Sequence, residues 1–354
     1  MMPHSALENI EDVLCVVESG AVDEKRIGMN ILESSEAHSF FKGVLKIEKR
    51  DEGWMPQRLT ERQLEYYAAS EGWKIRSQCA AGIILKLRTD SPWLDLEFEC
   101  LGGARNHLGL DVEVNGQVIH SVRREHFEGT FRERLLDFSD MPCKIRNIIV
   151  YFPCSMIVLL KNVDIAEDSG FNTMTIAPKH LLCLGDSITQ GMGSISPLST
   201  YAMQLALMLD AELINQGIGG HTFDVNSLDP PHAFMPHLIT VAYGTNDWSS
   251  GIGKEEITQK AFTYIGKLQD IFPGVPMYVI SPVWRNIWKE RKGDGLNLDE
   301  FGALIRHSAR EFKGVGTVNG FRMIPHQDMY FKDGTHPNEL GFMHYATNLY
   351  RAVR

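Results

Sequence analysis

Short runs of branched and aromatic residues, many with an apolar–polar alternation, cover the chain from about residue 40 to about residue 170. An alternation of period two is typical of strands with one buried face. The clearest such runs are 82–91, 92–103, 110–122, 144–153 and 155–165. Turn residues separate the runs, and convincing helical periods are missing between them. This pattern predicts an antiparallel β-sandwich of the jelly-roll kind.

The segment 110–122 gives the strongest local signal in this half. Val112 and Val114 alternate with polar residues, Asn115-Gly116 follows, and Val118 opens the next run. Asn-Gly between two such runs favours a two-residue type I′ hairpin. The segment 57–70 fits either a short helix or an irregular connection. The first 25 or so residues fit either a helix or an N-terminal arm.

After about residue 176 the period changes, and strand-like and helix-like segments alternate. We expect strands at 181–184, 212–218, 237–244, 276–282 and 321–325, and helices at 199–210, 254–272, 298–312 and 338–353. Alternating elements of this length predict βαβ units and a parallel sheet with helices on both faces. The sequence therefore predicts two domains, a β-sandwich at 1–176 and a flavodoxin-like α/β domain at 177–354.

Composition and charge restrict the function classes. The net charge of −10 argues against nucleic acid as a partner, because phosphate binding needs a basic field. We find neither a secretory signal nor an apolar run long enough for a membrane span, so we expect a cytoplasmic protein. The cysteines form no CxxC pair, and we expect six buried thiols, no metal site and no cofactor. The composition leaves open whether the chain forms a homo-oligomer.

The segment "LLCLGDSITQG" at 181–191 runs from a predicted strand into Gly-Asp-Ser. A phosphate loop would need GxxxxGK[ST], a dinucleotide site GxGxxG, and a nucleophile elbow GxSxG, and none of these matches. Taken alone, Ser187 fits the N-cap of the following helix. Ligands of a parallel sheet, however, lie beyond the carboxyl ends of its strands, and that is where Ser187 stands.

Three further segments change this interpretation. "NQGIGGHT" at 215–222 and "AYGTNDW" at 242–248 end predicted strands, and "FKDGTHPN" at 331–338 precedes the last helix. Together with Gly-Asp-Ser they place a hydroxyl, glycine amides, a carboxamide and an Asp-x-x-His pair at one sheet edge. These groups are the ones that acyl transfer needs.

These four ordered segments resemble the four sequence blocks of the SGNH (GDSL-type) hydrolase family, over about 180–354. The β-rich half resembles the jelly-roll domain that precedes such a hydrolase domain in two-domain carbohydrate acetylesterases. The resemblance implies a serine esterase that removes short acyl groups, above all acetyl, from sugars or oligosaccharides.

The resemblance also implies roles for single residues. Ser187 would be the nucleophile, His336 the base, and Asp333 the group that orients the imidazole. Because a neighbouring carboxylate favours the charged imidazole, we expect the pKa of His336 to be raised. Some related two-domain acetylesterases replace this carboxylate with a backbone carbonyl, so the sequence leaves open whether Asp333 is essential.

The oxyanion hole implied by the resemblance consists of the amides of Ser187 and Gly220 and the carboxamide of Asn246. Gly220 is preferred over Gly219 because the family's donor is the sixth residue counted from the asparagine of its block, here Asn215.

The substrate is less well defined by the sequence. Trp248 and Trp284 follow predicted strands, where they could stack on a sugar ring or belong to the core, and His221 could touch the substrate. Two alternatives stay open: a lysophospholipase or thioesterase with the same triad, and a sugar-binding protein with a degenerate hydrolase domain.

Overall fold

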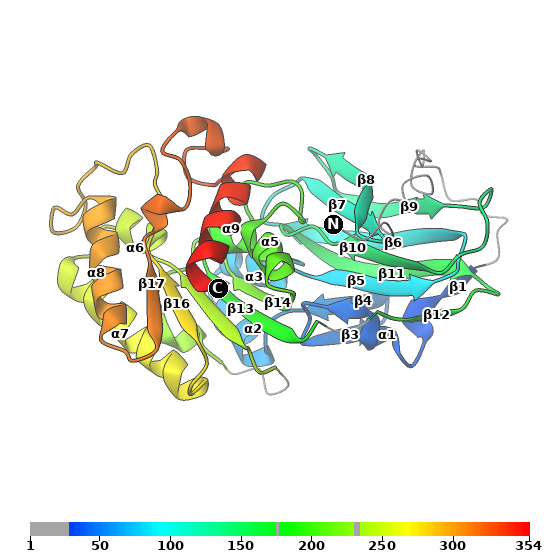
Figure 1. The fold of residues 1–354 in the computed structure, drawn as a ribbon, viewed down its shortest axis with the longest axis horizontal. Coiled ribbons are helices and arrows are strands. Elements are labelled where there is room, and N and C mark those ends of the chain that lie inside the picture. Colours follow the sequence, from blue (N-terminus) through cyan, green and yellow to red (C-terminus); the bar gives the residue numbers. More distant parts are fainter. Residues whose placement is uncertain (1–27, 175–176, 230–233) are drawn as a thin grey trace, which may run out of the picture.

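The computed structural model describes residues 28–174, 177–229 and 234–354, which form a β-sandwich and an α/β unit side by side (Figure 1). The predicted N-terminal arm lies outside the described residues. So does part of the connection between the two units, in which the predicted boundary at residue 176 falls. None of the described helices has the length and apolar character that a membrane span requires.

The first unit consists of two antiparallel sheets of six strands each among the described residues. One sheet has the order β3 (Lys46–Arg50), β4 (Gly53–Gln57), β11 (Met156–Ala166), β6 (Trp93–Gly103) and β9 (Gly129–Asp137), with β1 (Gly28–Asn30) beside β11. The other has the order β12 (Phe171–Thr173), β5 (Ile84–Thr89), β10 (Arg146–Tyr151), β7 (Leu108–Val114) and β8 (Gln117–Arg124), with β2 (Phe41–Lys42) beside β5. Their facing side chains form one continuous apolar core, so the predicted antiparallel sandwich is confirmed.

The structure confirms the predicted hairpin of this half and decides the ambiguous segment. The hairpin between β7 and β8 turns at Asn115 and Gly116, which both have positive φ (51° and 87°), as a type I′ turn requires. The ambiguous segment 57–70 contains the helix α2 (Glu61–Tyr67), which begins with a capping box at Thr60 and is followed by α3 (Glu71–Gln78). Two shorter elements, η2 (Ile31–Glu33) and α1 (Ala37–Phe40), lie between the strands β1 and β2.

The second unit is built on a parallel sheet. Its order is β14 (Ala211–Gly217), β13 (Lys179–Gly185), β15 (Leu238–Ala242), β16 (Met277–Ile280) and β17 (Val315–Val318). Counted along the chain this is 2-1-3-4-5, the flavodoxin-like order, as predicted. The short elements of this unit are α4 (Ser187–Gln190), η3 (Val225–Ser227), α6 (Thr245–Ser249), η4 (Gly320–Arg322) and η5 (Asp328–Tyr330).

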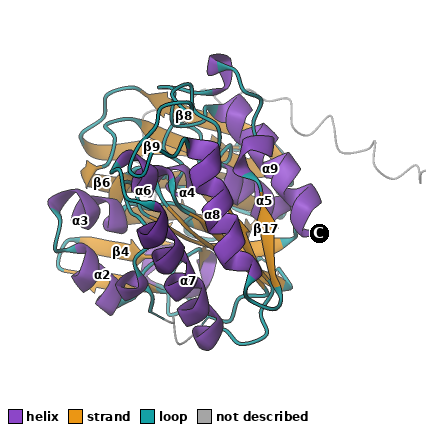
Figure 2. Ribbon diagram, turned by 90° about the vertical axis from the view of Figure 1, so that its left-hand side faces the viewer, coloured by secondary structure: helices purple, strands orange, loops and turns teal. Residues whose placement is uncertain are grey.

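Alternate residues of β13 explain why helices cover both faces of this sheet. Leu181 and Cys183 pack in the core formed with α5 (Tyr201–Met208) and α9 (Glu339–Val353). Leu182 and Leu184 pack in the opposite core, formed with α7 (Lys254–Ile271) and α8 (Leu298–Arg310). A strand that buries both of its faces shows a continuous apolar run, as here. Figure 2 shows these helix pairs on different sides of the sheet.

Two expectations about this sequence are wrong. The last strand is β17 at 315–318, whereas the run 321–325 begins in the 3₁₀ turn η4, because the side chain of Asn319 accepts a hydrogen bond from the amide of Phe321 (3.0 Å) and caps that turn. The expectation of six buried thiols fails at Cys143, which is exposed. The described cysteines are free thiols: Cys79, Cys100, Cys143, Cys154 and Cys183.

The two units are joined by buried polar contacts as well as by apolar packing. Arg58, which is 1% exposed, donates hydrogen bonds to the carbonyls of Cys79 (2.9 Å), Arg76 (2.9 Å) and Asn215. The carbonyl of Asn215 belongs to β14, so a side chain of the sandwich unit binds the parallel sheet directly. Burial lowers the pKa of Arg58 to about 10, which leaves the guanidinium charged at neutral pH.

We predict that Arg58→Met lowers the free energy of unfolding by about 3 kcal/mol or more, because three buried carbonyls lose their donor and an unsatisfied buried group costs roughly 1–3 kcal/mol. The matched control is Arg50→Met, which removes only an exposed ion pair with Glu48, worth about 0–1 kcal/mol. Urea unfolding followed by circular dichroism measures both. Equal midpoints for the two variants would show that Arg58 does not hold the units together.

Candidate active site

Ser187 stands at the carboxyl end of β13, as the first residue of the short helix α4. Asp186, not Ser187, is the N-cap of that helix, and its carboxylate accepts a hydrogen bond from the amide of Ile188 (2.9 Å). Thr189 of α4 fills the space beside Gly185 and Gly217. A Cβ at either glycine would come within 2.8 Å of Thr189, so only glycine lets α4 lie this close to the strand ends.

His336 lies in the loop before α9 and reaches Ser187. Its Nε2 is 2.8 Å from the Ser187 hydroxyl, and its Nδ1 is 2.8 Å from Oδ2 of Asp333. The other oxygen of Asp333 accepts hydrogen bonds from the amides of Thr335 (3.1 Å) and His336 (2.9 Å), so one carboxylate fixes both the loop and the imidazole. The structure thus brings these three predicted residues together in the order serine, histidine, aspartate.

The pKa values of this pair differ from our expectation in one respect. Burial lowers the pKa of His336 from its ordinary value near 6.5, and this effect outweighs the hydrogen bond and charge of Asp333, which act in the opposite direction. The expectation that the pKa of His336 is raised is therefore wrong. Burial alone would raise the pKa of Asp333, but its hydrogen bonds to His336 and Thr335 together lower it. A neutral imidazole beside a carboxylate is the state that can accept a proton.

The three predicted oxyanion donors lie around the same edge. Gly220 follows β14 with φ of 76°, whereas the amide of its neighbour Gly219 donates to Oε1 of Gln190 (2.8 Å) and is already used. Asn246, in α6, donates one carboxamide N–H to the carbonyl of His221 (2.9 Å). A carboxamide has two N–H groups, so this bond fixes the orientation of Asn246 and leaves the second N–H for another acceptor.

The predicted substrate-contacting side chains are in the core. Trp248 is 1% exposed and donates its indole N–H to the carbonyl of Leu296 (3.0 Å). His221 is fully buried, and Trp284 is stacked on His326 (ring centroids 5.6 Å apart). All three rings are largely buried, with Trp284 8% exposed, and their contact with a substrate stays a prediction. His221 contributes its backbone carbonyl instead.

The sandwich unit supplies residues at this edge that the sequence did not indicate. Arg76 of α3 donates to the carbonyl of Gly219 (3.0 Å). Tyr66 of α2 donates to Asp224 (2.7 Å) and lies 3.3 Å from Nε2 of His221. Burial lowers the pKa of His221 to about 4, so its imidazole is neutral at ordinary pH. These residues stand more than a hundred positions before the hydrolase motifs, and only the fold brings them to the loop after β14.

A parallel sheet with a serine–histidine–aspartate relay at its carboxyl edge is an arrangement that α/β hydrolytic and acyl-transfer enzymes use. Residues 183–343 match the family model described as GDSL-like lipase/acylhydrolase, so this part of the chain is a GDSL-like hydrolase domain.

Solved structures with a similar fold include a salicylyl-acyltransferase, SsfX3, from a tetracycline biosynthetic pathway (TM-score 0.74, 20% identity, 94% of this chain and 97% of that chain). A family two carbohydrate esterase from Clostridium thermocellum gives a TM-score of 0.61 (16% identity, 77% and 92% covered). An acetyl xylan esterase from Butyrivibrio proteoclasticus gives 0.55 (15% identity, 77% and 89% covered). These likenesses show that the two-unit fold is shared. No protein with a curated description matches the sequence.

We predict that the imidazole of His336 titrates with a pKa below 6.5, and that Asp333→Asn lowers it further, because the substitution removes a carboxylate that favours the charged ring. NMR titration of histidine-labelled protein measures this value, and the His336→Gln spectrum assigns the signal. The exposed Asp328→Asn is the matched control and should leave the pKa unchanged. A wild-type value above 6.5, or no shift in Asp333→Asn, would contradict the assignment.

Proposed function

We propose that the protein hydrolyses short acyl esters, acetyl esters above all, on sugars or small oligosaccharides through an acyl-enzyme on Ser187. The observation that carries the proposal is the continuous relay from the Ser187 hydroxyl through His336 to Asp333, with both contacts at 2.8 Å. In this proposal the substrate is a small acylated sugar that the enzyme meets in the cytoplasm.

The geometry supports the following chemistry. His336 accepts the proton of the Ser187 hydroxyl through Nε2 while the serine oxygen attacks the ester carbonyl. The amides of Ser187 and Gly220 and the free N–H of Asn246 would bind the negative oxygen of the tetrahedral intermediate. The C–O bond to the alcohol then breaks, and the alcohol leaves with the proton from His336. A water molecule then attacks the acyl-enzyme through the same two steps, which releases the carboxylic acid and restores the hydroxyl of Ser187.

The two-unit fold favours a sugar ester over a lipid ester. Structures described as a carbohydrate esterase and an acetyl xylan esterase have a similar fold over 77% of this chain. The alternative of a sugar-binding protein with a degenerate hydrolase domain is disfavoured by the intact relay. A lysophospholipase or thioesterase would use the same relay, and only the acyl chain separates it from our proposal.

A second candidate function is transfer of the acyl group to an alcohol other than water. The structure that covers 94% of this chain is described as an acyltransferase, whereas the carbohydrate esterases cover 77%. Hydrolysis and transfer share every step up to the acyl-enzyme and differ only in the acceptor. The ratio of acid to new ester, measured by chromatography with an acetyl donor and a sugar acceptor, separates them.

We predict that Ser187→Ala lowers kcat on an acetyl ester by about 10³-fold or more, because loss of the nucleophile of a coupled triad removes most of the catalytic effect. The fold should survive, since a serine replaced by alanine creates only a small gap. Ser35→Ala, at an exposed position in the sandwich unit, is the control. Intact-mass analysis after mixing with substrate should show an acetyl adduct on the wild type alone. A variant that keeps more than about a tenth of the turnover would rule out Ser187 as nucleophile.

We also predict that acetate esters are hydrolysed faster than octanoate esters of the same alcohol. In a pocket shaped for acetyl, added methylenes overpack the site, at a cost of about 1–3 kcal/mol. Initial rates with 4-nitrophenyl acetate, butyrate and octanoate provide the comparison. Equal or higher rates on octanoate would favour the lysophospholipase alternative.

A further inference from the structure

Arg76 of the sandwich unit lies against the loop that carries the predicted oxyanion donor. Its Nη1 donates to the carbonyl of Gly219 at 3.0 Å. A methyl group added at Gly220 would come within 3.1 Å of the same nitrogen. One N–H of the guanidinium is therefore used by the loop, whereas the rest of this five-donor group remains for another acceptor. A cation thus stands directly beside the residue whose amide would bind the reacting oxygen.

Arg105 adds a second cation from the loop between β6 and β7. It is partly buried, and its guanidinium donates to the adjacent carbonyl of Ala104 (3.0 Å). The amide of Ala104 in this loop donates to the carbonyl of Ser155 (2.8 Å), and the neighbouring Cys154 contacts the carbonyl of Gly191 (3.5 Å), so the loop lies against the segment that follows Ser187. The charge of Arg105 also helps to lower the pKa of His336 and of Arg76. Arg76 and Arg105, which we call the arginine pair, therefore belong to parts of the sandwich unit that border the hydrolase loops.

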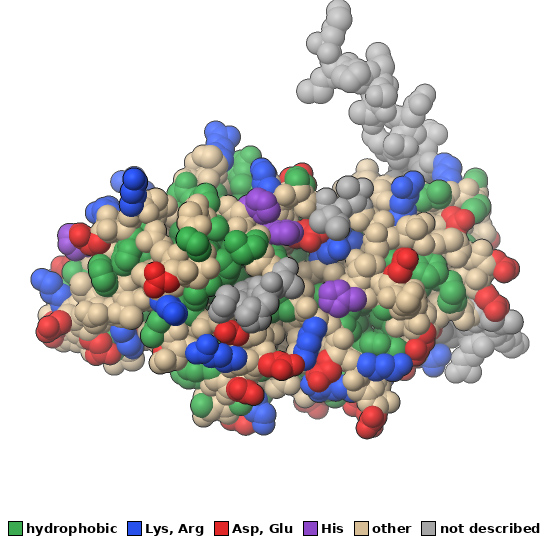
Figure 3. Space-filling model, turned by 90° about the horizontal axis from the view of Figure 1, so that it is seen from below, with side chains coloured by type: hydrophobic (Ala, Val, Ile, Leu, Met, Phe, Trp, Pro, Cys, Tyr) green, Lys and Arg blue, Asp and Glu red, His purple; other side chains and the backbone are tan. Residues whose placement is uncertain are grey.

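Neither member of the arginine pair has a carboxylate within ion-pair distance among the described residues, in contrast to two other arginines of the sandwich unit. Arg134 binds Asp95 (2.7 Å), and Arg123 binds Asp111. A cation taken partly out of water without a counter-ion is costly. The protein carries a net charge of −10, and on the face shown in Figure 3 acidic and basic side chains are interspersed. The unpaired positive charge beside Ser187 is therefore a local feature that calls for an anion.

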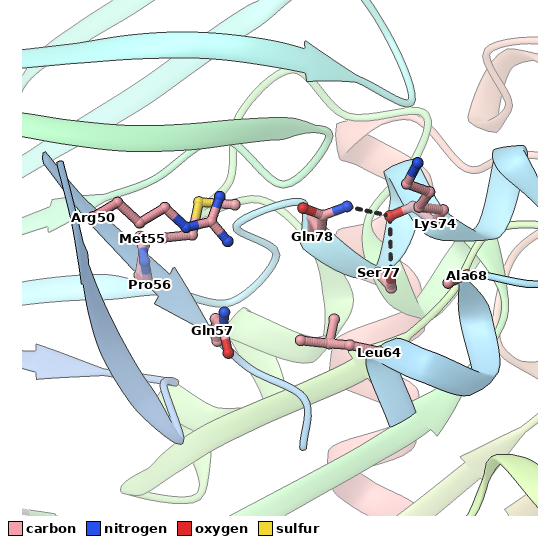
Figure 4. Close-up of a pocket in the computed structure, with 9 residues that line it drawn as sticks. All are labelled: Arg50, Met55, Pro56, Gln57, Leu64, Ala68, Lys74, Ser77 and Gln78. Carbon is pink, nitrogen blue, oxygen red and sulfur yellow. Dashed lines mark hydrogen bonds between the residues drawn. The ribbon is translucent and has the colours of Figure 1, made fainter. Parts of the chain in front are cut away.

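A nearby pocket shows the contrast. It lies between β4 and the helices α2 and α3, on the sandwich unit (Figure 4). Its cations are already paired, Arg50 with Glu48 and Lys74 with Glu71. The side chains of Ser77 and Gln78 both donate to the carbonyl of Lys74. The cations of this pocket thus have carboxylate partners, whereas each arginine of the pair has only a carbonyl partner among the described residues.

We infer that the enzyme acts on esters that carry a negative charge, a carboxylate or a phosphate, and that Arg76 and Arg105 bind this charge beside Ser187. The inference rests on the proposed ester hydrolysis and narrows its substrate class. Guanidinium groups bind such anions with paired, charge-assisted hydrogen bonds. The charge can stand on the alcohol, as in an acylated uronic acid, or on the acyl group, as in a half-ester of a dicarboxylic acid.

The test compares charged and neutral esters in two arms. The alcohol arm uses acetylated glucuronic acid and acetylated glucose, and the acyl arm uses the umbelliferyl half-ester of adipic acid and its neutral methyl diester. We expect the wild type to have the higher kcat/KM on the anionic member of at least one arm. Arg105→Gln should lower the anionic-to-neutral ratio by about tenfold or more, as expected for loss of a charge-assisted hydrogen bond.

The ratio separates binding of the charge from a general effect on His336. A change in the pKa of His336 alters both esters of an arm equally and cancels in the ratio. Arg105→Lys keeps the charge and should fall between wild type and Arg105→Gln, and the ratio should decrease with added salt. The control Arg50→Gln, on β3 of the same unit, should leave the ratio unchanged.

Failure of the inference and failure of the proposed function give different results. Hydrolysis that depends on Ser187 but shows no anionic preference in either arm, or a ratio unchanged in Arg105→Gln, overturns the inference alone. If no ester is hydrolysed, the proposed function fails, and calorimetry decides the inference. Acetylated glucuronic acid should then bind Ser187→Ala about tenfold or more tightly than Ser187→Ala combined with Arg105→Gln, and equal binding overturns the inference.

Discussion

The site depends on the register of β13 with its two neighbours. Gly185, the last residue of β13, is paired with Gly217 of β14 on one side and with Ala242 of β15 on the other. The three loops that follow therefore leave the sheet at one level, and Ser187, Gly220 and Asn246 meet although more than fifty residues separate the first from the last. A slip of one residue in either pairing would turn the strand's side chains to the opposite face and separate the groups.

The sandwich unit is part of this arrangement and not an appended module. Arg58 fixes it to β14, and α2 and α3 place Tyr66 and Arg76 against the loop after that strand. The hydrogen bonds continue inward, since Tyr66 contacts the ring of His221 and the carbonyl of His221 orients Asn246. On the opposite side, Asp111 of β7 accepts the hydroxyl of Ser196 (2.7 Å). The orientation of the hydrolase loops therefore depends on contacts from the first unit.

The sequence alone could predict the sheet order and the residues that meet at its edge, because buried parallel strands are continuous apolar runs and the motifs directly follow them. It could not predict β3, β4 or β9, since "KIEKR", "GWMPQ" and "GTFRERLLD" carry charged, proline or glycine residues that hide the alternation. Burial is a further property that the sequence does not give. The sequence does not distinguish a tryptophan in the core, such as Trp248, from a tryptophan at a binding surface. The pKa of His336 follows from desolvation, which only the folded chain determines. The arginine pair belongs to segments without any motif.

The contacts of Arg58 have a consequence for how this protein can change over generations. Its partners are main-chain oxygens, which every amino acid carries, so drift at positions 76, 79 and 215 leaves these particular contacts in place. These contacts therefore depend on the side chain at position 58 alone, because a new side chain at a partner position cannot replace a lost guanidinium. Proteins that keep both units joined in this way should therefore hold arginine at position 58, whatever side chains the three partner positions carry for other reasons. Exchange of either unit for a foreign one should fail unless that arginine and its surroundings are exchanged together.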